Sequence, residues 1–144
     1  MKPTLNRTAR RTRDLLILLL CFQLWSCSKS NSVVQWPELK HLDEWADKGG
    51  AWAEDHKVAD LRQNLPEIRK AMDTVLASSV PANAKDPGAV KLLLGDLKDL
   101  DQQLGKSPLE DKELETKVAS LDPIVANLMQ AAGMPHVHEH EEKK

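Results

Sequence analysis

Apolar residues recur at helical spacing in four stretches of this chain. The clearest stretch covers residues 61–79, where the steps between apolar positions alternate between four and three residues. This spacing places them on one side of a helix. Pro66 lies inside the stretch, but the apolar positions keep their register across it, so we expect a single kinked helix. The stripe includes Leu61, Leu65, Ile68, Met72 and Val75.

Three further stretches show similar spacing. The first covers residues 37–55 and contains the pair Gly49-Gly50, which can divide it into two helices. The other two cover residues 90–104 and 107–132, and the proline-containing segment 80–88 is predicted to be a loop. The apolar positions of these three stretches are Leu39, Leu42, Trp45 and Trp52, then Val90, Leu93, Leu97, Leu100 and Leu104, and finally Leu114, Val118, Leu121, Val125 and Leu128.

The ends of the last two helices carry specific signals. Gly105 stands at a C-cap position. Ser107-Pro108 is predicted to open the fourth helix as an N-cap followed by a first-turn proline, and Gly133 to end it. Outside the N-terminal stretch the sequence has no strand-like alternation. Four stripes joined by short loops predict an all-α fold, an antiparallel four-helix bundle.

The N-terminal stretch follows a different pattern. A basic segment precedes an apolar run from Leu15 to Trp25, and the run ends in Leu24-Trp25-Ser26-Cys27. The run has about 11 residues, whereas a helix that spans a bilayer needs about 20. Basic, apolar and small residues in this order are typical of a secretory signal peptide.

The ending Leu24-Trp25-Ser26-Cys27 resembles the lipobox of bacterial lipoprotein precursors. Leu24 at the third position before the cysteine and Ser26 directly before it carry the resemblance. It implies cleavage before Cys27 by signal peptidase II, and a diacylglycerol on the thiol together with an N-acyl chain. Such a set of acyl chains is enough for stable anchoring. The resemblance also implies, through Ser28, an outer-membrane lipoprotein that faces the periplasm.

The predicted cleavage before Cys27 is one of three boundaries that divide the sequence into four parts. The segment from Ser28 to Val34 spans at most about 25 Å, so a binding partner must lie close to the same membrane. Cys21 lies in the segment that would be removed, which leaves no pair of thiols for a disulfide. The parts are a signal peptide at 1–26, the lipidated cysteine and tether at 27–35, the helical bundle at 36–133 and a His/Glu-rich tail at 134–144.

Composition argues against several classes of function. Without residues 1–26 the chain has 118 residues, and its 15 basic and 21 acidic side chains give a net charge of −6, which disfavours nucleic-acid binding. Catalytic motifs such as Gly-x-Ser-x-Gly and glycine-rich phosphate loops are absent, so we expect no enzyme. The sequence also lacks Cys-x-x-Cys-His, which excludes c-type haem.

Length and stripe pattern resemble, at low specificity, the periplasmic four-helix bundles that include soluble b-type cytochromes and metal-responsive resistance proteins. Met72 lies on a suitable stripe for a haem ligand. No histidine falls in the second, third or fourth predicted helix, however, so a b-type haem is not expected.

The C-terminal tail contains the main candidate for chemistry. His136, His138 and His140 occupy alternate positions, and in an extended chain such residues project to one side. Neutral imidazoles bind copper, zinc and nickel, and the neighbouring glutamates add oxygen donors. The tail therefore predicts a site for a divalent transition metal. The alternative is a solvated polar terminus that binds metal only adventitiously.

The first helical stretch contributes weaker candidates. His41 and His56 are about 22 Å apart in one straight helix, but a break at Gly49-Gly50 could bring them closer together. Surface positions near the helix ends are the simpler interpretation of both histidines. The tryptophans of this region fit the core better than a partner surface, because the other helices supply no aromatic residues. They are Trp36, Trp45 and Trp52.

Two hypotheses follow from the sequence. In the first, a lipid-anchored helical protein binds Cu, Zn or Ni through its C-terminal histidines, for buffering, sensing or delivery. In the second, it is a structural or adaptor lipoprotein whose tryptophan-bearing first helix engages an envelope protein complex, and the tail is incidental.

Overall fold

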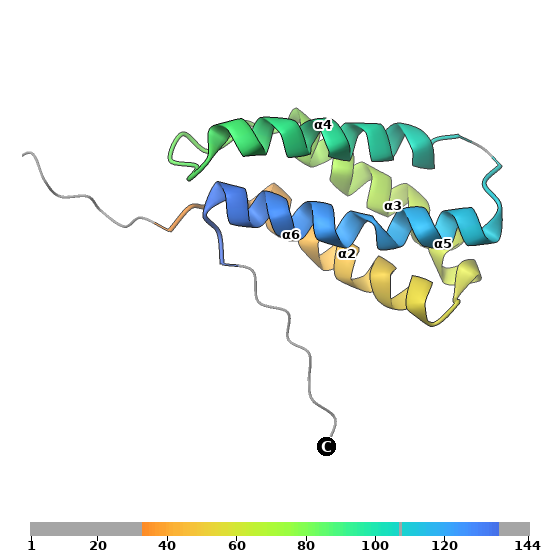
Figure 1. The fold of residues 1–144 in the computed structure, drawn as a ribbon. Coiled ribbons are helices and arrows are strands. Elements are labelled where there is room, and N and C mark those ends of the chain that lie inside the picture. Colours follow the sequence, from red (N-terminus) through yellow and green to blue (C-terminus); the bar gives the residue numbers. More distant parts are fainter. Residues whose placement is uncertain (1–32, 107, 136–144) are drawn as a thin grey trace, which may run out of the picture. The chain divides into compact units, whose positions relative to one another are not determined.

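The computed structural model describes residues 33–106 and 108–135, and throughout these residues the regular secondary structure is helical (Figure 1). The predicted all-α class is therefore confirmed for this part of the chain. The helices are α2 (Pro37–Glu54), α3 (Val58–Ala77), α4 (Pro87–Leu104), α5 (Asp111–Ala119) and α6 (Leu121–Ala132).

The core is built from the predicted apolar stripes. No polar or charged residue is buried in the described part of the chain. Full burial of a leucine or valine side chain contributes roughly 1.5–3 kcal/mol, so these positions supply most of the favourable free energy of folding. The predicted stripe positions that are buried are Leu39, Leu42, Leu61, Ile68, Met72, Val75, Val90, Leu97, Leu100, Leu104, Leu114, Val118, Leu121, Val125 and Leu128.

Helix α2 runs without interruption through Gly49-Gly50, so the suggested break at this pair is wrong. Gly49 is buried where α2 approaches α5, and the side chains of Val118 and Ile68 lie closest to it. The absence of a Cβ atom lets the two helices come close together. The glycine is therefore explained by packing between helices and not by a turn.

The two prolines inside predicted helices have different effects. Helix α3 continues through Pro66, as predicted. The fourth predicted helix is divided at Ser120 into α5 and α6, which follow one another along one line (Figure 1). Pro123 has no N–H to donate to the carbonyl of Ala119, and its ring would crowd that carbonyl in a continuous helix. In the first turn of α6 the missing donor costs nothing.

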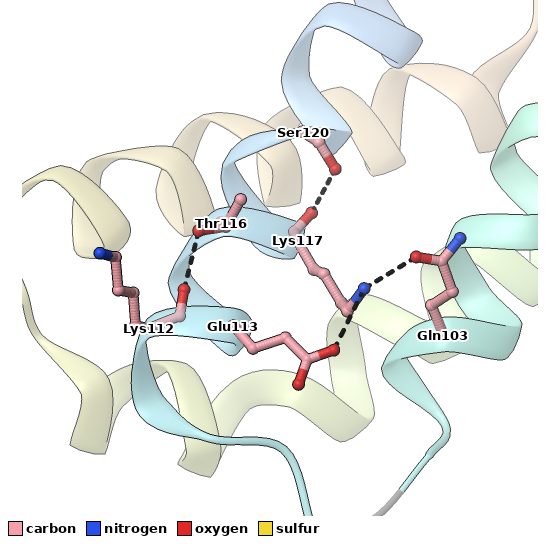
Figure 2. Close-up of polar contacts among 6 residues, drawn as sticks. All are labelled: Gln103, Lys112, Glu113, Thr116, Lys117 and Ser120. Atoms are coloured by element: carbon pink, nitrogen blue, oxygen red, sulfur yellow. Dashed lines mark hydrogen bonds and ion pairs between the residues drawn. The ribbon is translucent and has the colours of Figure 1, made fainter.

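Side-chain hydrogen bonds support the junction between α5 and α6 (Figure 2). The Ser120 hydroxyl donates to the Lys117 carbonyl at 2.7 Å, and the Ser120 N–H donates to the Thr116 carbonyl at 3.1 Å. The Lys117 ammonium reaches Gln103 Oε1 of α4 at 2.8 Å and Glu113 of its own helix at 3.3 Å. The last turn of α5 is thereby tied to α4.

Three helices begin at other residues than predicted, and the first of these, α3, begins at Val58 instead of Leu61. Helix α4 begins at Pro87, three residues early, because the Asp86 side chain accepts a hydrogen bond from the Ala89 N–H at 2.9 Å and caps the first turn. Helix α5 begins at Asp111 and residues 108–110 are not helical, so the start predicted at Pro108 is wrong, while its predicted N-cap, Ser107, lies outside the described residues. Before it, Leu109 is buried and its carbonyl accepts a hydrogen bond from Arg62 at 2.8 Å, which holds this segment outside the helix.

One end of the helical domain gathers the start of α2, the end of α3, the start of α4 and the end of α6. The Trp36 indole N–H donates to the Ser78 hydroxyl at 2.8 Å. The backbone N–H groups of Lys85 and Asp86 donate to the Ala132 and Ala131 carbonyls at 3.1 and 2.8 Å. We call this the terminal end, since both ends of the described chain lie there.

The opposite end, called the turn end, contains the α2–α3 turn at residues 55–57 and the start of α5. Arg62 Nη2 lies 2.6 Å from Asp111 Oδ1, and His56 Nδ1 lies 3.2 Å from Glu115 Oε1. Between the two ends, Arg69 of α3 donates two hydrogen bonds to Asp101 of α4, at 2.8 and 3.2 Å. The hydrogen bonds to Asp101 raise the pKa of the Arg69 guanidinium.

Candidate functional site

The principal predicted site residues lie outside the described part of the chain. Cys27, the predicted lipidation site, and the tail histidines His136, His138 and His140 are in this group. The predicted signal-peptide cleavage site also lies outside the described residues. The structure therefore bears on their function only through the segments that lead to them.

His41 belongs to a small cluster of side chains on the surface of α2. Its Nε2 accepts a hydrogen bond from the Trp45 indole at 3.3 Å, and its Nδ1 lies 3.8 Å from Glu44 Oε2. The two rings meet edge to face, and the Lys48 ammonium lies 5.1 Å from the centre of the Trp45 ring. We call these four residues the α2 surface cluster. A metal ion at His41 Nε2 would have to displace the indole hydrogen bond.

His56 occupies a special backbone position directly after α2. Its φ of 56° is in the left-handed region, which is unusual for a residue with a side chain. The N–H of His56 donates to the Ala53 carbonyl at 3.2 Å, and the N–H of Lys57 donates to the Trp52 carbonyl at 2.8 Å. This pair of bonds is a Schellman motif, which usually has glycine at the left-handed position. His56 is thus explained by the end of the helix, without a bound ligand.

The exposed residues that flank His56 form an ion pair. Lys57 Nζ lies 2.6 Å from Asp55 Oδ2. The hydrogen bond from Lys57 lowers the pKa of Asp55, and the same bond raises the pKa of Lys57. Both side chains are in water, where such a pair contributes little to stability.

The structure does not bring His41 and His56 together. Helix α2 is continuous between them, and 15 residues at about 1.5 Å each separate them by about 22 Å along the helix. The prediction that a break could fold them closer is therefore wrong. In residues 33–106 and 108–135 no three histidine, cysteine, aspartate or glutamate side chains are grouped so that they could hold a metal ion.

The tryptophans of α2 have different environments. Trp36, just before the helix, has a 2% exposed side chain and belongs to the core, as predicted. Trp45 and Trp52 are half-buried and pack against the edge of the core. The region is therefore neither a wholly buried aromatic cluster nor an exposed aromatic platform.

The tail leaves the helical domain beside the point where the tether enters it. Gly133 ends α6 with a φ of 84°, as predicted from its position. A Cβ atom on Gly133 would lie 3.8 Å from Val34 Cγ2, and Met134 after it packs against the core. Val34 belongs to the predicted tether but is buried, so among the described residues the core begins there. The two segments with predicted chemistry therefore join the domain at one end.

Three large apolar side chains are exposed in the described part of the chain. Val33, Val80 and Leu92 are 60%, 37% and 74% exposed. A signal was present for Leu92, because it lies in the run Leu92-Leu93-Leu94 but outside the stripe of the third predicted helix. A helix cannot direct three consecutive residues to the same core.

Comparison with known proteins gives no family assignment. No family model matches the chain, and no curated protein and no solved structure matches it either. Within the described residues, none of the helices combines the length and the apolar character that a bilayer span requires.

Proposed function

We propose that this chain is a membrane-anchored helical lipoprotein that binds a divalent transition metal through its C-terminal histidines. The observation that carries the proposal is the alternate spacing of His136, His138 and His140. In an extended segment three imidazoles at this spacing project to one side and can share one ion. A site in the segment that follows α6, outside the helices, suits capture, buffering or sensing better than catalysis, which needs rigidly held ligands.

The anchor in this proposal is Cys27. Residues 1–26 act as the signal peptide, the thiol of Cys27 carries the diacylglycerol, and the domain faces the periplasm from the outer membrane. The sequence Leu24-Trp25-Ser26-Cys27 supports this assignment. Metabolic labelling with a radioactive fatty acid tests it, because label should enter the wild-type protein and be lost in Cys27→Ser.

The helical domain in this proposal is an antiparallel four-helix bundle, with α5 and α6 together as its fourth arm. The hydrogen bonds that join the start of α4 to the end of α6 support it. The pairing of Trp36 before α2 with Ser78 after α3 supports it as well. In this arrangement the bundle is a rigid support, and the tail carries the ligands.

Calorimetric titration of Cu(II), Zn(II) and Ni(II) into the purified protein tests metal binding. We expect saturable, submicromolar binding of at least one ion, which the triple variant His136/His138/His140→Ala should lose. The double variant His41/His56→Ala is the matched control and should bind as the wild type does. Weak binding, or equal binding by the triple variant, would contradict the proposal.

A second candidate function is that of an adaptor for an envelope protein complex. The α2 surface cluster favours it, since a half-buried tryptophan beside histidine, glutamate and lysine is a surface that a protein partner can recognise. Affinity purification distinguishes the two functions. An adaptor should lose a specific partner on Trp45→Ala and keep it when residues 134–144 are deleted.

A further inference from the structure

We infer that the terminal end of the helical domain lies against the phospholipid bilayer. This inference rests on the proposed lipid anchor at Cys27 and adds to it an orientation and a contact surface. The surface comprises Val33, the α3–α4 loop with Val80, and the second turn of α4 with Leu92. The partner is the headgroup region of the membrane that holds the anchor.

The length of the tether carries the first step of the argument. Val34 is the first core residue in the described part of the chain, and it lies at the terminal end beside Gly133. It follows Cys27 by seven residues, a distance of at most about 25 Å even in a fully extended chain. Helix α4 alone has 18 residues and is about 27 Å long. The tether is therefore too short to run past the domain and bring the turn end to the membrane.

The distribution of exposed apolar side chains distinguishes the terminal end from the flanks. In the described part of the chain, the exposed large apolar residues are Val33, Val80 and Leu92. Val33 directly precedes the core, Val80 follows α3 in the loop before α4, and Leu92 is the sixth residue of α4, about 8 Å from its start. Interfacial segments insert apolar groups about 5–10 Å into the boundary between headgroups and acyl chains. One shallow contact can therefore cover all three side chains.

The charged side chains at the two ends of the domain are consistent with the same orientation. The exposed Lys85 and Lys91 flank the start of α4, where their ammonium groups can reach lipid phosphates. The carboxylate next to Lys85, on Asp86, is occupied by capping the helix. At the turn end, by contrast, ion pairs such as Asp55–Lys57 and Arg62–Asp111 are exposed, as expected of a surface in water.

Lipid-proximity quenching tests the orientation with the complete, processed protein. Single cysteines would be introduced at the terminal end, as Val80→Cys and Leu92→Cys, and at the turn end, as Asp55→Cys and Lys106→Cys. Each variant is labelled with a fluorophore and reconstituted in vesicles of phosphatidylethanolamine and phosphatidylglycerol that contain a headgroup spin label. All four positions are exposed, so the labels leave the core intact.

We expect several-fold stronger quenching at Val80 and Leu92 than at Asp55 and Lys106. Equal quenching at both ends, or stronger quenching at the turn end, would overturn the orientation. Protection of Leu92 from soluble quenchers without quenching by lipid would also overturn it, since a protein would then cover this surface.

The parent protein without an introduced cysteine separates this inference from the proposed anchor. If Cys27 is lipidated and Cys21 is removed, the parent takes up no label. Labelling of the parent at Cys27 would overturn the anchor, and the orientation with it. If the parent is membrane-bound and takes up no label, the anchor stands. Quenching only in the Lys106→Cys variant would then overturn the orientation alone.

Discussion

Gly49 of α2 packs so closely against Val118 of α5 that a Cβ atom on the glycine would lie 2.7 Å from the Val118 Cγ1 methyl group. Its neighbour Gly50 has no atom within 4 Å of the corresponding position. Both glycines are in the interior of the same helix. The pair thus separates the effect of a glycine on helix propensity from its effect on packing.

The two alanine substitutions should change stability in opposite directions. Gly50→Ala removes the flexibility of glycine and should stabilise the protein by about 0.5–1 kcal/mol. Gly49→Ala gains the same propensity but forces Val118 to move, which costs about 1–3 kcal/mol, so we expect net destabilisation of up to about 2 kcal/mol. Urea denaturation followed by circular dichroism measures both.

The double variant Gly49→Ala/Val118→Ala checks the cause. Because Val118→Ala removes the methyl group that collides, the double variant should be more stable than the sum of the two single effects. Strict additivity would show that the close approach does not limit the substitution.

The hydrogen bond between Trp36 and Ser78 gives a second prediction. The indole N–H of Trp36 is buried with its side chain, and the Ser78 hydroxyl accepts from it while donating to the Val75 carbonyl at 2.8 Å. Ser78→Ala leaves the indole donor without this partner, which should cost about 1–3 kcal/mol in the free energy of unfolding. The exposed Ser79→Ala is the control and should change it by less than about 0.5 kcal/mol.

Thermal denaturation of the two serine variants under identical conditions makes this comparison. The intrinsic fluorescence of the Ser78→Ala variant should also change, since Trp36 loses a polar neighbour. Equal melting temperatures for the two variants would show that the hydrogen bond contributes nothing net.

The core of this fold could be predicted from the sequence because the spacing of apolar residues within each single helix indicates which of them are buried. The stripe from Leu61 to Val75 appears in the structure as one continuous helix, with Leu65 only half-buried. The unbroken path of α2 through Gly49 was not predictable, since it depends on how close Val118 of another helix comes. The division at Ser120 was missed, although Pro123 in the sequence offered the signal.

The candidate site residues could be proposed from the sequence for a different reason. The proposals at Cys27 and the tail rest on local motifs, which can be read without the fold. Whether His41 and His56 could meet depended on the continuity of α2, and only the structure answers that. The left-handed backbone of His56 leaves no local signal, because the residue at the left-handed position of such a helix end is usually glycine.

The backbone at His56 gives a third prediction. A residue with a side chain at φ 56° is strained, whereas glycine adopts this conformation freely. His56→Gly should therefore stabilise the protein by about 0.5–1 kcal/mol, although it removes the exposed contact to Glu115. His41→Gly, in the interior of α2, should destabilise it by about 1 kcal/mol.

Urea denaturation of the two glycine variants at pH 7 tests this contrast. A loss of stability in His56→Gly would mean that the interaction with Glu115 outweighs the backbone strain. Both variants should retain the metal affinity of the wild type, because neither histidine belongs to the proposed site.

The proposed metal site predicts a specific dependence on pH. Only neutral imidazole binds a metal ion, and an unperturbed histidine has a pKa of about 6.5. The affinity of the tail should therefore level off only above about pH 7.5 and fall steeply as the pH drops below about 6.5, since protons compete for each of the three ligands. Isothermal titration with Zn(II) or Cu(II) between pH 5 and 8 measures this.

A variant with Glu139, Glu141 and Glu142 changed to glutamine should bind more weakly but keep the same pH dependence. Affinity that stays constant down to pH 5 would instead identify carboxylates as the ligands, because glutamates with a pKa of about 4.3 remain charged there.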